Sequence, residues 1–214
     1  GTYVVTTTVV AGDKRLIAEV TASPSNDLDM FVGLDDGDGI PESGEVKCTS
    51  ATGAVLEYCN ISSPAAGTYW VLIQNFSSST IGAEDPVTLV TAVVPATDEG
   101  NMTITAPISA TSGVLYDIGV DYVLPDNEAT RFYGVFTVGT KPATPTDLGT
   151  VLVDIHRTLN DVAVLPASDE KSGSPSDVIT YTVSIENTGL VEDTFTVSMI
   201  GNAWETELSA TSVT

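Results

Sequence analysis

Basic residues are scarce in this sequence. Its 214 residues include 7 lysines and arginines against 29 aspartates and glutamates, so the formal net charge is −22 at neutral pH. Such a surface repels nucleic acid and anionic membranes, because both carry dense negative charge. Charged residues nonetheless make up only 17% of the chain and hydrophobic residues 42%, which is not the composition of a disordered acidic tail. We therefore expect a folded, acidic protein without a nucleic-acid partner.

Long apolar runs and helical stripes are also missing. No run approaches the roughly 18 apolar residues that a membrane-spanning helix needs, so we expect no membrane span. Apolar residues instead alternate with Thr, Ser and other polar residues at period two, which predicts strands. The predicted strands are 3–9, 16–20, 69–73, 87–93, 102–104, 114–122, 132–138, 151–155, 179–185 and 195–199. The fold class expected is all-β, with tandem antiparallel β-sandwich modules.

The chain is too long for one small sandwich, and breaks in the pattern suggest where modules meet. Pro95 to Gly100 interrupts the strands with proline, acidic residues and glycine, and a further set of strands starts near Asn160. We predict modules over 1–97, 98–158 and 159–214, the last short enough to be truncated. The N-terminal residues lack the basic and apolar segments of a signal peptide, so both ends are interpreted as cuts through a larger polypeptide.

Only two cysteines are present, Cys48 and Cys59, with ten residues between them. A disulfide over this short, turn-flanked loop suits a secreted protein, and the alternative is a pair of buried free thiols. A zinc site is not expected, because there is no C-x-x-C and the one histidine, His156, is far away in the sequence.

Residues for catalysis are equally sparse. His156 follows a predicted strand, and the chain contains no G-x-S-x-G or other nucleophile signature that would pair with it. A pair of glycosidase-type carboxylates is not excluded by 29 acidic residues, but no aromatic-rich cleft pattern accompanies them. We predict that this chain has no catalytic site.

One acidic loop has the composition of a cation site. Asp35, Asp36 and Asp38 lie among glycines, and Asp27 and Asp29 share one face of the strand before them. Calcium prefers six to eight oxygen ligands, which closely spaced carboxylates on a glycine-turned loop supply. The spacing departs from the EF-hand, since the fifth position counted from Asp36 is Ile40. The alternative is a solvated turn in which Asp and Gly are simply good turn formers.

Aromatic residues offer a second candidate surface. Tyr69 and Trp70 are adjacent in a predicted strand, so one ring points outward if only one face of the sheet is covered. Trp70 with Phe76 would then form a patch for an unfolded or fibrous protein substrate. In the alternative, the strand is central and both of its faces are covered.

Two separated motifs carry a resemblance to a known family. The segment D-L-D-M-F-V-G begins at Asp27, and the segment P-A-A-G-T-Y-W-V-L-I begins at Pro64, with the cysteines between them. Over roughly residues 12–95 this order resembles the pre-peptidase C-terminal domain, a β-sandwich appended to secreted bacterial peptidases, above all subtilisin-like serine proteases. Residues 98–158 resemble a fibronectin-like β-module. The I-T-Y-T-V…N-x-G pattern between Ile179 and Gly189 is similar to an immunoglobulin-like repeat of prokaryotic surface proteins.

The resemblance implies a non-catalytic, extracellular accessory region whose protease domain lies upstream in the same polypeptide. Its role would be to support secretion, stability or the engagement of a protein substrate. The alternative is a binding or structural region of a cell-surface or adhesin-type protein built from the same modules.

Overall fold

The alternating pattern of the sequence produces strands in nearly every part of the chain. In the computed structural model, which describes residues 1–125 and 129–214, fifteen strands and one short 3-10 helix are found. The predicted all-β class is therefore confirmed. Over the same residues, no helix is long and apolar enough to cross a membrane.

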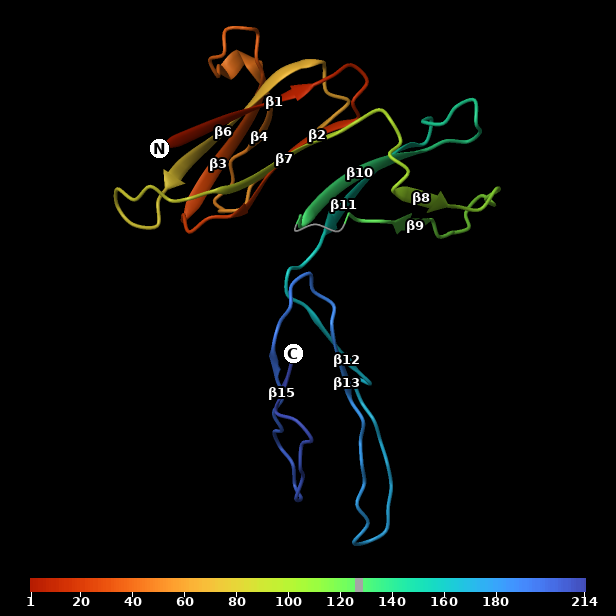
Figure 1. The fold of residues 1–214 in the computed structure, drawn as a ribbon. Coiled ribbons are helices and arrows are strands. Elements are labelled where there is room, and N and C mark those ends of the chain that lie inside the picture. The colour runs from red at the N-terminus through yellow and green to blue at the C-terminus, as the bar shows by residue number, and fades with distance from the viewer. Residues whose placement is uncertain (126–128) are drawn as a thin grey trace. The chain divides into compact units, whose positions relative to one another are not determined.

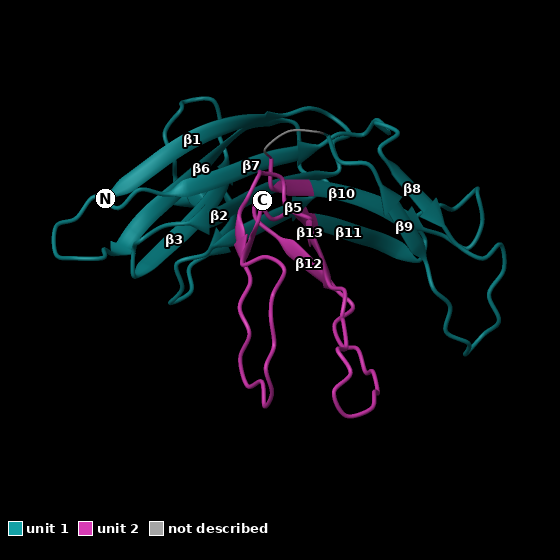
Figure 2. Cartoon of the chain, turned by 60° about the horizontal axis from the view of Figure 1, so that its bottom comes forward, with its two compact units in different colours: residues 1–125, 133–154 teal, residues 126–132, 155–214 magenta. Residues whose placement is uncertain are grey.

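Contacts between residues divide the chain into two units (Figure 2). The first comprises residues 1–125 and 133–154, and the second comprises residues 126–132 and 155–214. The first unit therefore takes in most of the residues on both sides of the predicted boundary at 97/98. The division into three modules stays a prediction.

Two stacked antiparallel sheets form the sandwich of the first unit (Figure 1). The four-stranded sheet has the order β1-β6-β3-β4, with β1 (Thr2–Val9), β6 (Gly67–Ser77), β3 (Asp27–Leu34) and β4 (Val46–Ser50). The three-stranded sheet has the order β5-β2-β7, with β5 (Tyr58–Ser62), β2 (Arg15–Ala22) and β7 (Thr88–Val94). The 3-10 helix η1 (Ser43–Glu45) precedes β4.

The core lies between these two sheets. It is built from alternate residues of the strands: Val9, Leu16, Ala18, Val20, Leu28, Met30, Val32, Tyr69, Val71 and Ile73, with Cys59. Each is at most 2% exposed. In the strands predicted over 16–20 and 69–73, alternation in the sequence therefore predicted the core-facing residues correctly, because successive side chains in a strand point to opposite faces. Among the described residues, every buried one lies between Val9 and Ile73.

Strand β2 is covered on both of its faces. Arg15, Ile17 and Glu19 point away from the core, yet Arg15 and Ile17 are fully buried and Glu19 is 9% exposed. The cover comes from β10 (Arg131–Val138) and β11 (Gly149–His156), which pair with each other and contribute hydrogen-bond partners to the Arg15 and Glu19 side chains. Part of the first unit is therefore three layers deep.

The strand predicted over 114–122 is much shorter than expected. Only β9 (Gly119–Tyr122) forms, and it pairs with β8 (Met102–Thr105). The partner strand ends before Pro107, which has no N–H to donate to a ladder, so residues 114–118 have nothing to pair with.

The second unit contains two short ribbons. One pairs β12 (Val162–Leu165) with β13 (Ser184–Asn187), and the other pairs β14 (Phe195–Thr196) with β15 (Ser212–Val213). The strands predicted over 179–185 and 195–199 are therefore confirmed only in part. Two-stranded ribbons cannot bury both sides of an alternating sequence, and the apolar side chains of this unit remain largely outside any core.

Candidate functional site

The acidic loop follows β3 directly. Its first residue, Asp35, donates its backbone N–H to the carbonyl of Thr68 at 2.9 Å, which extends the sheet by one hydrogen bond. Carboxylate oxygens of Asp35, Asp36 and Asp38 all lie within 4.8 Å of one another. The loop thus brings three of the five predicted ligands together.

Two of these carboxylates also shape the loop. Asp35 Oδ1 accepts the N–H of Gly39 at 2.9 Å, and Asp38 Oδ1 accepts the N–H of Ile40 at 2.8 Å. Aspartate side chains commonly accept hydrogen bonds from nearby backbone N–H groups in turns, so these contacts do not require a bound ion. Each carboxylate keeps a second oxygen, so the trio fits a hard cation only if backbone carbonyls or water complete the six to eight ligands of calcium.

The base of the loop is fixed by Glu45. Its carboxylate accepts the indole N–H of Trp70 at 2.7 Å and the backbone N–H groups of Asp36 at 2.6 Å and Glu42 at 3.3 Å. These donors stabilise the charged form, the Trp70 bond most of all, and they lower the pKa of Glu45 below its usual value. Glu45 therefore ties both ends of the acidic loop to the sheet.

Trp70 lies against the backbone of β3. It pairs with Gly33 across the β3–β6 ladder, and a Cβ added to Gly33 would come within 2.0 Å of the indole ring. The ring is 3% exposed, so the prediction that Trp70 offers an exposed surface is wrong. The reason is that Tyr69 fills the core on one face of β6 while Glu45 meets Trp70 on the other. Phe76, six residues further along β6, is 66% exposed, and its role in binding stays a prediction.

The glycine of the P-x-x-G-T-Y segment opens β6. Gly67 has a φ of +152°, and a Cβ there would lie 2.6 Å from the Leu34 side chain. Only glycine combines this backbone angle with so close a neighbour. Two residues on, Tyr69 is 1% exposed and pairs with Leu34. The motif therefore sets the start of a core strand.

Asp27 and Asp29 lie at the other end of β3. They share one face, as predicted, but Asp29 is six positions from Asp35 along an extended chain, or about 20 Å. The two carboxylates therefore do not join the acidic loop. Burial, then the charges of Asp27 and Glu57, raises the pKa of Asp29. Asp27 Oδ1 is buried, with no hydrogen-bond partner among the described residues.

The predicted disulfide is confirmed. Cys48 of β4 and Cys59 of β5 are joined with an S–S distance of 2.07 Å. Because β4 and β5 belong to different sheets, the bond closes the sandwich along one side. Beside it, the fully buried Glu57 accepts hydrogen bonds from Ser50 and Thr52 and so orders the connection between the two strands.

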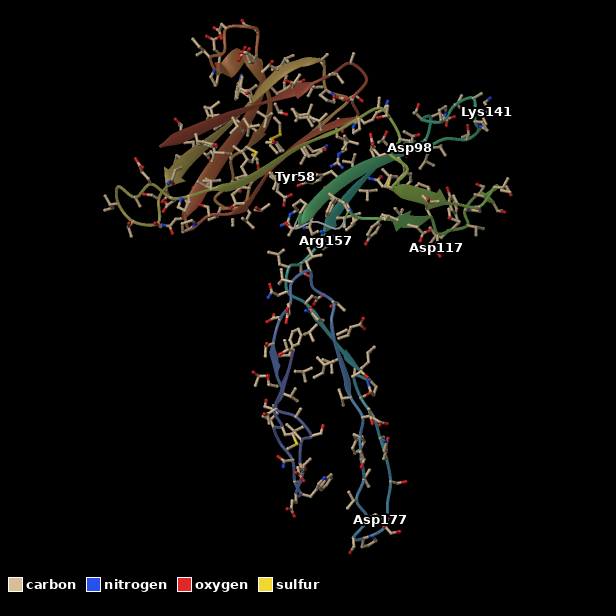
Figure 3. The ribbon with its side chains drawn as sticks, in the orientation of Figure 1. Tyr58, Asp98, Asp117, Lys141, Arg157 and Asp177 are labelled. Carbon is tan, nitrogen blue, oxygen red and sulfur yellow. A yellow bond between two sulfur atoms is a disulfide. The ribbon has the colours of Figure 1, made fainter. Side chains whose placement is uncertain are left out.

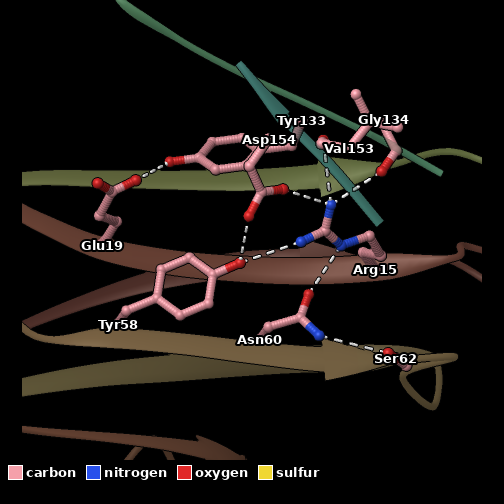
Figure 4. Close-up of polar contacts among 9 residues, drawn as sticks. All are labelled: Arg15, Glu19, Tyr58, Asn60, Ser62, Tyr133, Gly134, Val153 and Asp154. Carbon is pink, nitrogen blue, oxygen red and sulfur yellow. Dashed lines mark hydrogen bonds and ion pairs between the residues drawn. The ribbon is translucent and has the colours of Figure 1, made fainter. Parts of the chain in front are cut away.

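A buried polar cluster was not predicted from the sequence (Figure 4). Arg15 lies at its centre and is fully buried. Its guanidinium donates to Asp154 Oδ1 at 2.7 Å, Asn60 Oδ1 at 2.7 Å and the Tyr58 hydroxyl at 3.0 Å, as well as to the carbonyls of Gly134 at 2.8 Å and Val153 at 3.4 Å. Arg15 thus connects β2 and β5 of the sandwich with β10 and β11.

Two tyrosines complete the cluster. The Tyr58 hydroxyl donates to Asp154 Oδ2 at 2.8 Å, and the Tyr133 hydroxyl donates to Glu19. Burial and the nearby Asp154 raise the pKa of Tyr58 to about 12. The only signal in the sequence was that Arg15 and Glu19 lie on the face of β2 that points away from the core. That signal is weak, because polar residues are equally expected on a strand face that is exposed to solvent. Because each of the three guanidinium nitrogens donates to a protein acceptor, we interpret the cluster as structural.

The one residue considered as a catalytic base is His156, the single histidine of the chain. His156 is exposed at the last position of β11. Asp98, Asp117 and Asp177 lie in turns and loops along the chain (Figure 3). The lack of a catalytic site stays a prediction.

A scan of the chain against protein families, curated proteins and solved structures finds no match.

Proposed function

We propose that this chain is a non-catalytic accessory region of a secreted subtilisin-like serine endopeptidase. The observation that carries the proposal is the pair of motifs that begin at Asp27 and Pro64. What supports it is that these separate segments supply β3 and β6, neighbours in one sheet of a small sandwich, which is the kind of fold the resemblance implies. Gly67 and Tyr69 of the second motif both have a defined role in that sandwich.

In this proposal the region is exported with an upstream protease domain and stabilises it, supports its secretion or engages its protein substrate. A disulfide between Cys48 and Cys59 favours an oxidising compartment, because such bonds persist outside the cytosol. The exposed Phe76 is the remaining aromatic candidate for substrate contact.

Calcium is proposed as a ligand of the acidic loop. The carboxylates of Asp35, Asp36 and Asp38 are close enough to share one cation. Three carboxylates at this separation repel one another, so a divalent cation would relieve that repulsion. Glu45 contributes by holding the loop and not by binding the ion, since both of its oxygens already accept hydrogen bonds.

A second candidate function is that of a binding or structural region in a cell-surface protein. It is favoured by the turn at the end of β13 in the second unit, where Asn187 accepts the N–H of Gly189 at 3.0 Å and donates to the carbonyl of Val191 at 2.8 Å. This N-x-G turn follows β13 in the segment that is similar to immunoglobulin-like repeats of surface proteins.

The coding sequence upstream of Gly1 separates the two functions. The protease proposal expects it to encode a subtilisin-like domain with a serine nucleophile, a histidine base and an orienting carboxylate. A run of further β-modules without those residues would contradict the protease proposal and support the surface protein. If the protease is found, its secretion and thermal inactivation should be compared with and without residues 1–214.

A further inference from the structure

Strand β1 forms a free edge of the four-stranded sheet (Figure 1). Its eight residues pair with β6 in an unbroken antiparallel register from Thr2↔Gln74 to Val9↔Gly67. Among the described residues it pairs with no other strand. In such a strand about half of the backbone N–H and C=O groups point away from the partner, so a row of them faces outward along the edge of β1.

The other edges of the sandwich carry features that hinder pairing. Strands β4 and β5 have only five residues each and are tied together by the disulfide, and β4 carries Lys47. The ladder of β7 is interrupted opposite Val20, and Pro86 and Pro95 lie close to its two ends. Short strands, charges, prolines and irregular pairing are the usual protections of sheet edges. Strand β1 has none of them.

Strand β1 also lacks the negative charge that would make two copies of this acidic chain repel each other at a shared surface. Residues 1–12 contain no charged side chain, although the chain carries a net charge of −22. Since β4 and β5 occupy the disulfide side, β1 and β7 lie at the opposite side of the sandwich. Tyr3 lies on the core-facing side of β1 but is 57% exposed, which indicates that this part of β1 extends beyond the three-stranded sheet. Val4, on the outer face, is 42% exposed.

We propose that β1 is a homodimerisation edge, at which two copies of the chain pair antiparallel through their β1 strands. An antiparallel pair of identical strands is related by a two-fold axis, so one edge serves both partners. The result is a continuous eight-stranded sheet in which Tyr3 and Val4 are covered. Acidic residues elsewhere on the two copies repel each other and so weaken the association. Salt screens this repulsion. The proposal is independent of the proposed protease function.

The test is sedimentation of the full 214-residue chain over a range of concentrations and salt. We expect a dimer that strengthens as ionic strength rises, and amides of β1 whose hydrogen exchange slows with protein concentration. Thr6 is exposed near the middle of β1, so Thr6→Glu and Thr6→Lys both place like charges close to their copies and should weaken the dimer at least about tenfold. Thr49→Glu adds the same charge on the opposite edge strand, β4, and should leave the dimer intact.

Several results would overturn the proposal. One is a chain that stays monomeric at all concentrations, which would leave the edge to another partner. Another is a dimer that persists in Thr6→Glu, or that weakens with salt. If Thr6→Glu weakened the dimer while Thr6→Lys strengthened it, net charge alone would govern association, and β1 would not be the contact. Thermal unfolding of each variant checks that the fold is retained.

Discussion

Arg15 is one of seven basic residues in the chain, and its side chain is fully buried. A buried guanidinium is stable only when its donors are satisfied and its charge is paired, and here Asp154 supplies the charge. The Asp154 side chain remains 32% exposed, which reduces the strength of the ion pair itself. The value of Arg15 therefore lies as much in its bonds to Asn60 and to the carbonyls of β10 and β11 as in the salt bridge.

Replacing Arg15 should loosen the layer formed by β10 and β11. Arg15→Met keeps much of the side-chain volume but removes the guanidinium that donates to Asp154 Oδ1 and to two carbonyls, so we expect a loss of about 2–4 kcal/mol in the free energy of unfolding. Urea denaturation measures this loss. Lys14→Met removes a charge from the neighbouring exposed position and should change stability by no more than about 0.5 kcal/mol. Equal effects of the two substitutions would contradict the assigned role of Arg15.

Glu45 makes the stability of the sandwich depend on pH. Its pKa is lowered in the folded protein, so the unfolded chain takes up the proton more readily. The stabilisation is fully present above the usual glutamate value of 4.5 and is lost as the pH falls through the lower folded pKa. Melting temperature measured from pH 6 down to pH 3 should therefore fall less steeply in Glu45→Gln, which starts from a lower stability at pH 6. Glu84→Gln, at an exposed position, should follow the wild-type profile.

At the scale of elements, the disulfide links the two sheets at β4 and β5. In the chain-entropy account, closing a loop of this length contributes roughly 3 kcal/mol by restricting the unfolded chain. We expect the double substitution Cys48→Ala and Cys59→Ala to lower the unfolding free energy by about that amount while the sandwich still folds. Intact mass should show the native chain two protons lighter than the reduced chain. Two thiols that are freely alkylated in unreduced, secreted material would rule the bond out.

The acidic loop is the element on which calcium should act. If Asp35, Asp36 and Asp38 bind the ion, calcium at 100 times its dissociation constant should add about 2.7 kcal/mol to stability. Melting should shift upward with millimolar calcium and downward with chelator, and magnesium should do less, because it demands a stricter octahedral shell. Asp36→Asn combined with Asp38→Asn should abolish the shift.

The structure supplies the matched control for that experiment. Asp27→Asn with Asp29→Asn removes the same charge from the far end of β3 and should leave the calcium shift in place. A melting temperature that ignores calcium and chelator at constant ionic strength would leave the loop as a solvated turn.

The sequence predicted elements well where alternate residues of a strand face a common core. Leu16, Ala18 and Val20 alternate with other residues, and all three lie in the core. The prediction was poorer where alternation had no partner strand, as at 114–118 and over most of 179–185. Alternation reports only that a segment would suit a sheet, and pairing depends on residues far away in the sequence.

The candidate sites show the same limit. The Asp35–Asp38 trio and the disulfide involve residues close in sequence, and both were predicted. The burial of Trp70 depends on Gly33 and Glu45, and the Arg15 cluster spans more than a hundred residues, from Arg15 to Asp154. No local pattern contains such contacts.

At the scale of the whole molecule, we expect no hydrolysis of proteins or esters by this chain. This expectation rests on the absence of a nucleophile signature from the sequence and on the exposed position of His156, the one histidine. Assays with casein and small peptide esters should give background rates that match the His156→Ala variant. Turnover that disappears in His156→Ala, and that survives controls for contaminating protease, would overturn this expectation.

The two tryptophans of the chain fall one in each unit. Trp70 is 3% exposed and hydrogen-bonded to a carboxylate, whereas Trp204 is 79% exposed. Their fluorescence should therefore resolve into a component that acrylamide hardly quenches and one that it quenches freely. The protected component should be lost only when the disulfide-closed sandwich unfolds, while the other reports on the second unit. The native sequence thus provides a separate optical probe for each unit without any label.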